Sequence, residues 1–303
     1  MTPTIHTLTG NLLWERTLEL ATWVPGQTHR AKTESFQVGG KGINVSRMLT
    51  RLGASTRALC FAGGSTGADC LAWLTAKNIS HQAFATSAAT RSGTVVRSSN
   101  QPETTFLGPD APPDAAAWTD CAATVDALPA NDILALCGSF PGWNSLEAEP
   151  LRTAIARRAS LAHVVADTYG PPLMWALQQP FAFIKINRDE FNALASQMSH
   201  IEPFPSQLTT QLRLSKSSAI IITDGPNPVW YADRTNPPRQ FVPPAITAIS
   251  PTGSGDVLLA GLLHGHFQRG LSLPEALTYA LPYAAANAAH PGIADFDLNN
   301  LPA

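Results

Sequence analysis

The stretch Ile133-Leu-Ala-Leu-Cys137 is an unbroken apolar run, with helix-like segments on either side at Asp114–Leu128 and Leu146–Arg158. Such a run is typical of a parallel strand that is covered on both faces. Five more segments are expected to be strands: Thr4–Leu8, Thr56–Phe61, His163–Ala166, Phe181–Lys185 and Ala219–Ile222. Helical patterns lie between them at Gly42–Leu52, Gly67–Asn78, Asp189–Gln197 and Gln207–Lys216. This alternation predicts an α/β fold with a doubly wound, mainly parallel sheet flanked by helices.

Two extended segments interrupt the alternation. Thr17–Val38 and Ser92–Leu107 are hairpin-like, with turn residues at Pro25-Gly26 and Asn100-Gln101-Pro102. Both lie beside glycine-rich segments, so we expect a small β-sheet lid, residues 17–38 and 92–107, on a single domain that spans residues 1–303. An open sheet has edges and one apolar face to cover, and pairing of two lids covers them. We therefore expect a homodimer that forms through the lids.

The composition excludes several classes of protein. With 44% hydrophobic and 14% charged residues, a chain of 303 residues buries a large core and is not disordered. A net charge of −2 without basic runs argues against a nucleic-acid partner. No apolar stretch approaches the roughly 18 residues that span a bilayer, and the first residues lack the pattern of a signal peptide. We expect a cytoplasmic protein that binds a small molecule and no membrane.

The segment Ser250-Pro-Thr-Gly-Ser-Gly-Asp256 leads into an apolar helix. Its glycines allow a tight turn, so free N–H groups and the positive end of the helix dipole converge on one anion site. Asp256 falls in the first helical turn, where a carboxylate is held ionised and could accept a hydroxyl proton during phosphoryl transfer. These residues alone fit equally well a helix start in which the glycines serve packing and Asp256 is a cap.

A second glycine-rich segment reads Val38-Gly-Gly-Lys-Gly-Ile-Asn-Val45. Its glycines bracket Lys41 at the start of another helix, and Asn44 follows one turn later. Backbone donors and an ammonium could hold a polyol or a phosphate there, although an ordinary turn between strand and helix has the same pattern. The segment is not a P-loop, because the required earlier glycine and the Ser or Thr after the lysine are missing.

Together these segments resemble the phosphofructokinase B group of ribokinase-like carbohydrate kinases, and the resemblance extends over almost the whole chain. Further matching segments are Thr9–Thr17, Pro25–Arg30, Cys137–Gly142, Asp167–Gly170, Lys185–Glu190 and Thr223–Gly225. The lysine of Gly-Gly-Lys-Gly and the stretch Glu103-Thr-Thr105 look most like 1-phosphofructokinases and tagatose-6-phosphate kinases. The resemblance implies a ribokinase-like fold and an ATP-dependent kinase that uses Mg²⁺ and phosphorylates a hydroxyl of a phosphorylated ketohexose.

The resemblance also implies roles for individual residues. It makes Asp256 the catalytic base and the N–H groups of Gly253, Ser254 and Gly255 the anion hole. The implied substrate-binding residues are Asn11, Glu15, Gly39, Gly40, Lys41, Asn44, Arg91 and Ser139. The implied nucleotide-binding residues are Lys185, Asn187, Glu190, Thr223 and Gly225. Glu190 would hold Mg²⁺ through water, since this ion prefers oxygen ligands and keeps several waters.

The sequence departs from the family pattern near the expected sugar site. Glu15 stands where the group has Asp, and Leu12 and Trp14 replace other residues beside it. Because these changes reshape the corner that reads sugar hydroxyls, a kinase of an unphosphorylated sugar or nucleoside stays an alternative. An inactive sugar-binding regulator is a more remote one, since Asp256 and its glycines are intact.

A rival from another reaction class comes from Gly63-Gly-Ser-Thr-Gly67, which matches the G-x-S-x-G pattern of a hydrolase nucleophile. Ser65 would be the nucleophile, with partners such as Asp167 and His290 farther along the chain. The pattern is short and leaves both glycine-rich segments described above unexplained. A serine hydrolase is therefore the weaker interpretation.

Overall fold

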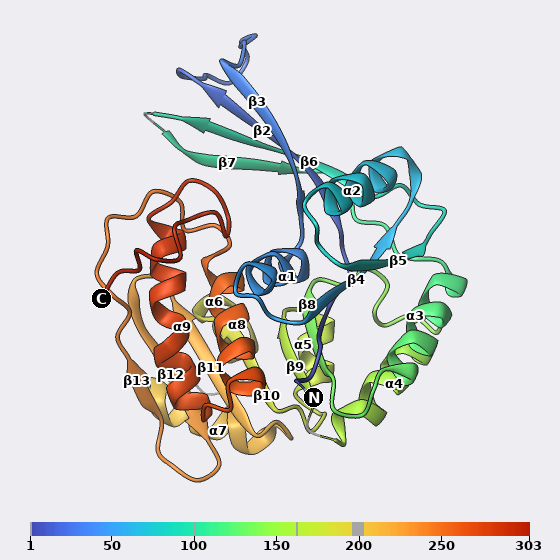
Figure 1. Ribbon diagram of the computed structural model, residues 1–303, viewed down its shortest axis with the longest axis vertical. Coiled ribbons are helices and arrows are strands. Elements are labelled where there is room, and N and C mark those ends of the chain that lie inside the picture. The colour runs from blue at the N-terminus through green and yellow to red at the C-terminus, as the bar shows by residue number, and fades with distance from the viewer. Residues whose placement is uncertain (1, 100, 162, 196–202) are drawn as a thin grey trace.

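The computed structural model describes residues 2–99, 101–161, 163–195 and 203–303, and its core is a nine-stranded sheet (Figure 1). The strand order is β13-β12-β11-β10-β9-β8-β1-β4-β5. In chain order the strands are β1 (Ile5–Thr9), β4 (Thr56–Ala62), β5 (His81–Ala85), β8 (Ile133–Gly138), β9 (Val164–Thr168), β10 (Phe183–Asn187), β11 (Ala219–Asp224), β12 (Asn227–Asp233) and β13 (Arg239–Phe241). In the order of the sheet, all neighbouring strands between β5 and β11 pair in parallel. β12 and β13 then add two antiparallel strands beyond β11.

Helices cover both faces of this sheet, which confirms the predicted doubly wound α/β fold (Figure 1). The helices are α1 (Lys41–Arg51), α2 (Gly64–Ala76), α3 (Ala115–Ala127), α4 (Glu149–Ala159), α5 (Pro171–Ala176), α6 (Arg188–Ala195), α7 (Phe204–Leu214), α8 (Ser254–Leu263), the π-helix η1 (His264–Gln268) and α9 (Leu273–Ala288). One buried cluster joins the sheet to α3, α4 and α5, and another joins it to α1, α8 and α9. None of the helices in the described ranges is long and apolar enough to cross a membrane.

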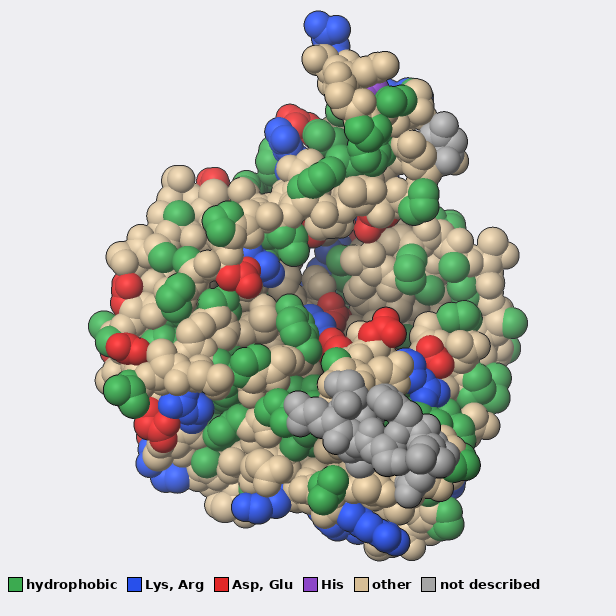
Figure 2. Space-filling view, turned by 180° about the vertical axis from the view of Figure 1, so that it is seen from behind, with side chains coloured by type: hydrophobic (Ala, Val, Ile, Leu, Met, Phe, Trp, Pro, Cys, Tyr) green, Lys and Arg blue, Asp and Glu red, His purple; other side chains and the backbone are tan. Residues whose placement is uncertain are grey.

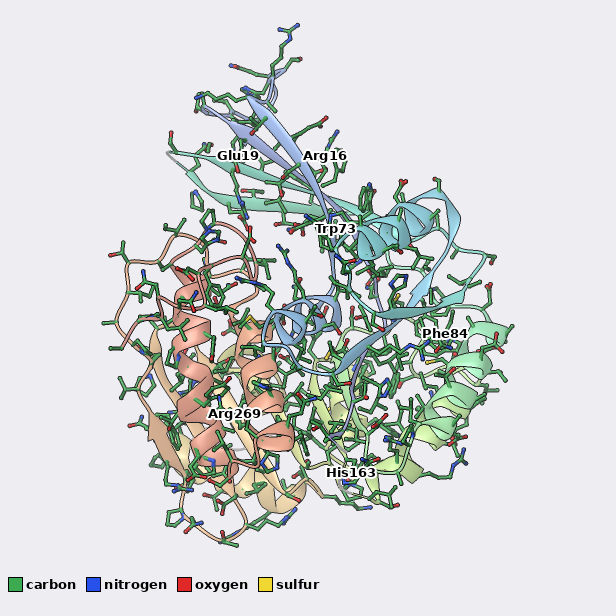
Figure 3. All side chains as sticks on the ribbon, viewed as in Figure 1. Arg16, Glu19, Trp73, Phe84, His163 and Arg269 are labelled. Carbon is green, nitrogen blue, oxygen red and sulfur yellow. The ribbon has the colours of Figure 1, made fainter. Side chains whose placement is uncertain are left out.

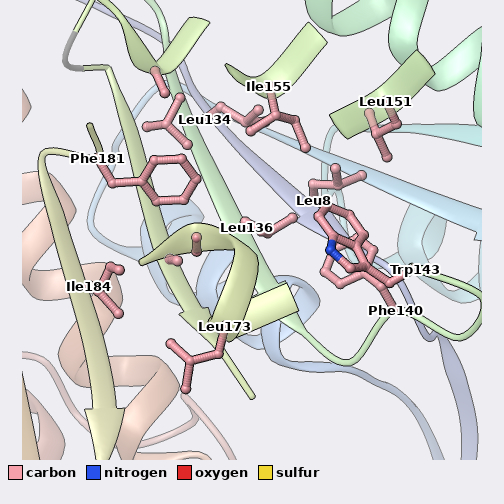
Figure 4. Close-up of a cluster of buried hydrophobic side chains, with 14 of the residues drawn as sticks. Leu8, Leu134, Leu136, Phe140, Trp143, Leu151, Ile155, Leu173, Phe181 and Ile184 are labelled. Carbon is pink, nitrogen blue, oxygen red and sulfur yellow. The ribbon is translucent and has the colours of Figure 1, made fainter. Parts of the chain in front are cut away.

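The apolar run that predicted β8 has a direct physical explanation. Leu134 and Leu136 belong to the buried cluster on one face of the sheet, whereas Ile133, Ala135 and Cys137 belong to the cluster on the other. Successive strand side chains point to opposite faces, so a strand covered on both sides is apolar at every position. Figure 4 shows the first cluster, in which Leu134 and Leu136 lie near Phe181 and Trp143.

A second, four-stranded sheet stands above the body in the order β3-β2-β6-β7 (Figure 1). Its strands are β2 (Leu13–Leu20), β3 (Thr33–Gly39), β6 (Arg91–Ser98) and β7 (Gln101–Leu107). We call it the lid sheet; it is the separate small sheet that the sequence predicts, and its closure over a ligand stays a prediction. Arg16 and Glu19 mark it in Figure 3, at the end of the molecule opposite His163.

The elements differ from the sequence-based expectation mainly at their ends. The strand predicted at Phe181–Lys185 lies at Phe183–Asn187, and β2 begins at Leu13, before the expected Thr17. The last two residues of the predicted helix Asp189–Gln197 lie outside the described residues. Asn100 of the predicted turn also lies outside them. β5, β12, β13, α5 and α9 were not predicted.

The crossing of α8 and α9 requires a glycine at position 261. A Cβ at Gly261 would lie 2.7 Å from the Cβ and 2.9 Å from the Cα of Ala280. In an open helix, Gly→Ala stabilises by up to about 1 kcal/mol. Here we expect Gly261→Ala to lower the free energy of unfolding by about 1–3 kcal/mol, the usual cost of overpacking. Urea unfolding of the variant beside the wild type measures the difference.

The double variant Gly261→Ala/Ala280→Gly is the matched control, because it removes the Cβ that the new methyl group meets. It should recover part of the loss, whereas Ala280→Gly alone should only destabilise. A single variant Gly261→Ala that is as stable as the wild type, or more so, contradicts the close approach.

Candidate active site

The carboxyl ends of neighbouring parallel strands supply polar residues at one edge of the large sheet. Asn11 and Ser139 follow β1 and β8, Asp167 lies in β9, and Asn187 and Thr223 end or nearly end β10 and β11. In open α/β sheets, ligands bind in the crevice outside these strand ends. The lid sheet rises above the same edge, and charged side chains gather in the hollow between it and the body (Figure 2).

The start of α8 is shaped by two glycines. Gly253 has a φ of 76°, which is left-handed, and a Cβ at Gly255 would lie 2.7 Å from Lys185 Nζ. Of the three N–H groups expected to form an anion hole, that of Ser254 donates to the Pro251 carbonyl at 3.1 Å. The N–H groups of Gly253 and Gly255 make no hydrogen bond within the described residues. Two donors at a helix N-terminus are thus open to an anion.

Asp256, the predicted base, is buried in the first turn of α8. Asn44 Nδ2 donates to its Oδ2 at 2.7 Å, and Oδ1 accepts no hydrogen bond from the residues that the structure describes. Burial and then the charge of Asp167 raise the pKa of Asp256 to about 6, although Lys41 and the Asn44 hydrogen bond oppose the shift. A free carboxylate oxygen with such a pKa suits proton abstraction near neutral pH.

Asp167 joins two of the predicted lysines. Its Oδ1 accepts from Lys41 Nζ at 2.8 Å and its Oδ2 from Lys185 Nζ at 2.7 Å, while its side chain is 0% exposed. Lys41 Nζ also donates to Glu190 Oε1 at 3.1 Å. Burial alone would raise the pKa of Asp167, but the two lysines outweigh it and lower that pKa. Burial alone would lower the pKa of Lys41, but the carboxylates of Asp167 and Glu190 outweigh it and raise that pKa. Lys41 therefore lies between two carboxylates.

Asn187 and Glu190 hold each other in place. The Asn187 N–H donates to Glu190 Oε2 and the Glu190 N–H donates to Asn187 Oδ1, both at 2.8 Å. Thr223, on the neighbouring strand, donates through Oγ1 to the Ile186 carbonyl at 3.5 Å. Gly225 makes the exposed turn after β11 with a φ of 53°. The structure brings Asn187, Glu190 and Thr223 to one end of β10 and β11, with Gly225 just beyond.

Gly39 and Gly40 connect the lid sheet to the body. Gly39 ends β3, and Gly40 precedes α1 with a φ of 122°, where its Cβ would lie 2.8 Å from Thr9 Cγ2. The next helical turn carries Lys41 and Asn44, which reach Asp167 and Asp256. This glycine pair therefore fixes where the first helix begins, and with it two polar contacts of the site.

Three predicted residues, Asn11, Arg91 and Ser139, meet at the other side of the site together with Asp110, which was not predicted. We call these four residues the substrate corner. Asn11 Nδ2 donates to Ser139 Oγ at 3.0 Å and to Asp110 Oδ1 at 2.8 Å. Arg91 Nη1 donates to the same Asp110 oxygen at 2.8 Å. Gly138, which precedes Ser139, lies beside Lys41: a Cβ built at Gly138 would be 3.7 Å from the Cβ of Lys41.

Glu15 lies on the lid sheet and faces the same way as Arg91. On paired β2 and β6, Leu13 is opposite Arg91 and Glu15 is opposite Gly93, so both side chains point to one face. Glu15 Oε1 accepts from Gln37 Nε2 at 2.5 Å. The glutamate that replaces the expected aspartate is therefore held within the lid sheet and makes no hydrogen bond to the other predicted site residues in the described ranges.

The same face of the lid sheet contacts the loop before α8. Glu103 Oε2 accepts from Arg97 Nε at 2.6 Å, and its Oε1 accepts from Thr252 Oγ1 at 3.1 Å. Thr252 directly precedes Gly253. The position of the lid sheet is therefore linked to the turn that opens α8.

Asn287, from α9, holds that turn in place and is not among the residues that the sequence predicts. It is fully buried, its Nδ2 donates to the Thr252 carbonyl and to Ser254 Oγ, both at 3.0 Å, and its Oδ1 accepts from the Ala294 N–H at 2.7 Å. The amide nitrogen thus holds the start of α8, and the amide oxygen ties the same side chain to the segment after α9. A lone amide in an alanine-rich helix is only a weak signal in a sequence.

Asp110 was not predicted. Asp167 was named only in the matching segment Asp167–Gly170 and as a partner in the hydrolase interpretation, without a role in the kinase site. Asp167 ends an apolar strand pattern, and a carboxylate in that position is a usable signal. Asp110 lies in a proline-rich connection, and nothing in the sequence pairs it with Arg91.

The hydrolase interpretation finds no support in the geometry. Ser65 lies in the first turn of α2, Asp167 is bonded to two lysines, and His290 Nδ1 accepts from the Gly292 N–H at 3.0 Å. No hydrogen bond joins Ser65, Asp167 and His290 within the described part of the chain. A nucleophile of this type needs a base within reach.

Known proteins share both the sequence pattern and the fold. Residues 9–299 match the protein family described as "pfkB family carbohydrate kinase". The 1-phosphofructokinase of Bacillus subtilis (strain 168) is 26% identical over 296 residues, covering 94% of this chain and 92% of that protein. Phosphofructokinase-2 from Escherichia coli, solved in complex with fructose-6-phosphate, has a TM-score of 0.84 at 23% identity, covering 95% and 94%. Ribokinase from Thermotoga maritima has a TM-score of 0.74 at 16% identity, covering 97% and 95%.

These similarities decide two of the predictions. The two solved structures confirm the ribokinase-like fold, with its large sheet and separate small sheet. The family match spans nearly the whole chain and confirms the predicted enzyme class. The chain therefore belongs to the pfkB family of carbohydrate kinases.

Proposed function

We propose that this enzyme transfers the γ-phosphoryl group of ATP to a hydroxyl of a phosphorylated ketohexose, such as fructose 1-phosphate or fructose or tagatose 6-phosphate. The observation that carries the proposal is the substrate corner, where Arg91, Asn11 and Ser139 converge. A guanidinium binds phosphate in two-point fashion, and amide and hydroxyl donors add to it. The names of the Bacillus subtilis and Escherichia coli proteins, which refer to phosphorylated fructose, support the same class.

In the proposed reaction Asp256 is the base. Its Oδ1 takes the proton of the sugar hydroxyl as that oxygen attacks the γ-phosphorus, and the bond from phosphorus to the ADP oxygen breaks. Asn44 holds the other carboxylate oxygen and so fixes the orientation of the base. The free N–H groups of Gly253 and Gly255 stabilise charge on the transferred group, and losing one such donor typically costs about 100- to 1,000-fold in rate.

The nucleotide would lie along the ends of β10 and β11, where Lys185, Asn187, Glu190 and Thr223 are found. The donor set fits magnesium, since Glu190 offers carboxylate oxygens at the mouth of the site and Mg²⁺ commonly takes one or two carboxylates plus phosphates and waters. When bound, Mg²⁺ would neutralise charge on the phosphate oxygens. Lys41 and Asn187 hold the Glu190 carboxylate at this position.

A screen of acceptors beside the variant Arg91→Ala tests the substrate class. We expect ADP release with at least one sugar phosphate, and a KM for that acceptor at least about tenfold higher in the variant, because a charge-assisted hydrogen bond is worth about 1.5–3 kcal/mol. ADP release at varied acceptor concentration measures both.

Arg157→Ala is the matched control, because this exposed arginine pairs with Asp126 on the surface of the body; its KM should stay at the wild-type value. Activity confined to unphosphorylated sugars or nucleosides, unchanged by Arg91→Ala, would favour the alternative acceptor class. Acceptor binding without any ADP release would favour the inactive regulator.

The pH dependence of kcat/KM tests the base. Asp256 has a pKa of about 6 and accepts a proton only when it is ionised. We therefore expect kcat/KM to be constant above this pH and to fall by about tenfold per pH unit below it. Asp256→Asn should reduce turnover by about 100- to 10,000-fold, while nucleotide binding persists in calorimetry.

The fall of kcat/KM at low pH could also come from ionisation of the acceptor phosphate, whose second pKa is also about 6. The pH dependence of the residual activity of Asp256→Asn separates this ionisation from that of Asp256. If Asp256 is the base, the residual rate loses the acid limb. A variant that retains more than about a tenth of wild-type kcat rejects Asp256 as the base. A variant with a much lower kcat and the same acid limb assigns the limb to the acceptor phosphate instead of Asp256.

We also propose that the enzyme is a homodimer that pairs through the lid sheets. Phe36, Arg16, Thr94 and Phe106 stand opposite one another across the four strands, so they share one face of the sheet. Alternation puts this face opposite the one that carries Glu15 and looks toward the body. Phe36 is 44% and Phe106 56% exposed, and large exposed side chains on such a face suit a partner.

Light scattering at micromolar concentration tests this assembly. We expect a dimer for the wild type and a monomer for Phe36→Ser/Phe106→Ser, because the substitutions remove about 1.5–3 kcal/mol of burial per side chain and copy. Leu146→Ser is the control, since Leu146 is 87% exposed away from the lid sheet, and it should remain dimeric. A monomeric wild type with full activity removes the lid-pairing proposal and leaves the kinase intact.

A further inference from the structure

Asp110 occupies the place that an acceptor phosphate would need. Its Oδ1 accepts from both Arg91 Nη1 and Asn11 Nδ2, at 2.8 Å each, and Asn11 is bonded in turn to Ser139. These are the three donors on which the proposed function relies. An internal carboxylate thus takes up two of these donors, Arg91 and Asn11.

The two sides of this contact differ in how firmly they are held. The Arg91 side chain is 15% exposed and Asn11 is 9% exposed, whereas the Asp110 side chain is 52% exposed and comes from the connection between β7 and α3. The donors are therefore fixed in the protein, while the carboxylate can turn into solvent without uncovering any core.

Arg91 has donor capacity that Asp110 does not use. Its Nε is buried and has no hydrogen-bond partner in the described residues, and only Nη1 reaches the carboxylate. A half-exposed, one-point ion pair contributes little. A phosphate dianion carries more charge and can bind a guanidinium at two points.

We propose that Asp110 is a specificity-determining residue, an internal anion that the phosphate of the acceptor must displace from Arg91 and Asn11. This inference rests on the proposed function, because it assumes that the acceptor carries a phosphate. Displacement lowers the affinity for every anion at the corner. A doubly charged phosphate that uses several donors overcomes this competition, and a singly charged carboxylate does not.

Asp110→Asn and Asp110→Ala test the proposal, the first keeping the shape and the second removing the acceptor atoms. We expect both to lower the KM for the sugar phosphate by about 3- to 30-fold, since they end the competition for the two donors and remove a like charge a few ångströms from the bound phosphate. The effect should lie in KM rather than kcat and should shrink as salt rises from 0.05 to about 0.5 M. Inorganic phosphate, followed by thermal shift, should bind more tightly to both variants, which gives a readout without turnover.

Asp126→Asn makes the same change of net charge at the surface pair with Arg157 and should leave KM and phosphate binding unchanged. An unchanged or higher KM in both Asp110 variants, with active wild type on sugar phosphates, overturns the inference and leaves the proposed function standing. No activity of wild type on any sugar phosphate overturns the proposed function itself. The phosphate titration then still reports whether Asp110 competes for the corner.

Discussion

Asp167 is fully buried at the carboxyl end of β9 and accepts hydrogen bonds from two ammonium groups. Its charge is stabilised by those lysines. Removing both would leave an uncompensated charge in the core, and loss of the partner of a buried charge typically costs about 3–5 kcal/mol. Gly255 leaves room for the Lys185 ammonium, since a Cβ there would lie 2.7 Å from Lys185 Nζ. Lys41 extends the network to Glu190. The start of α8 and the end of β10 are thus both positioned around one carboxylate, and the same charge helps to raise the pKa of Asp256.

Helix α1 joins parts of the chain that are far apart in sequence. Lys41 contacts Asp167 and Glu190, and Asn44 contacts Asp256 across 212 residues. The strand before this helix belongs to the lid sheet, which also touches the loop before α8 through Glu103 and Thr252. A movement of the lid sheet is therefore coupled mechanically to the residues proposed to do chemistry, from two directions. Closure that excludes water is the usual role of such a lid in a kinase.

The sequence was informative where burial dictates residue type and uninformative where partners meet only in space. Strands such as β8 and β11 were predictable because both faces are covered, whereas the edge strands β12 and β13 are partly exposed and carry mixed side chains. The glycine-rich turns indicated Asp256 and Lys41 as site residues, because the backbone geometry of the turns before them favours glycine. The pairing of Asp110 with Arg91 depends on how a proline-rich connection folds back, which no local pattern encodes.

The charges of the described site bear on the proposed cation and on the proposed phosphorylated acceptor. Lys41, Lys185 and Arg91 face the carboxylates of Asp110, Asp167, Glu190 and Asp256, so the protein itself supplies no excess of positive charge. Two of the three cations are already engaged with Asp167. Bringing ATP and a phosphorylated sugar together in this hollow would add several negative charges within a few ångströms. The imbalance supports the proposed magnesium at Glu190, and the proposed release of Arg91 from Asp110 would free a cation for the acceptor.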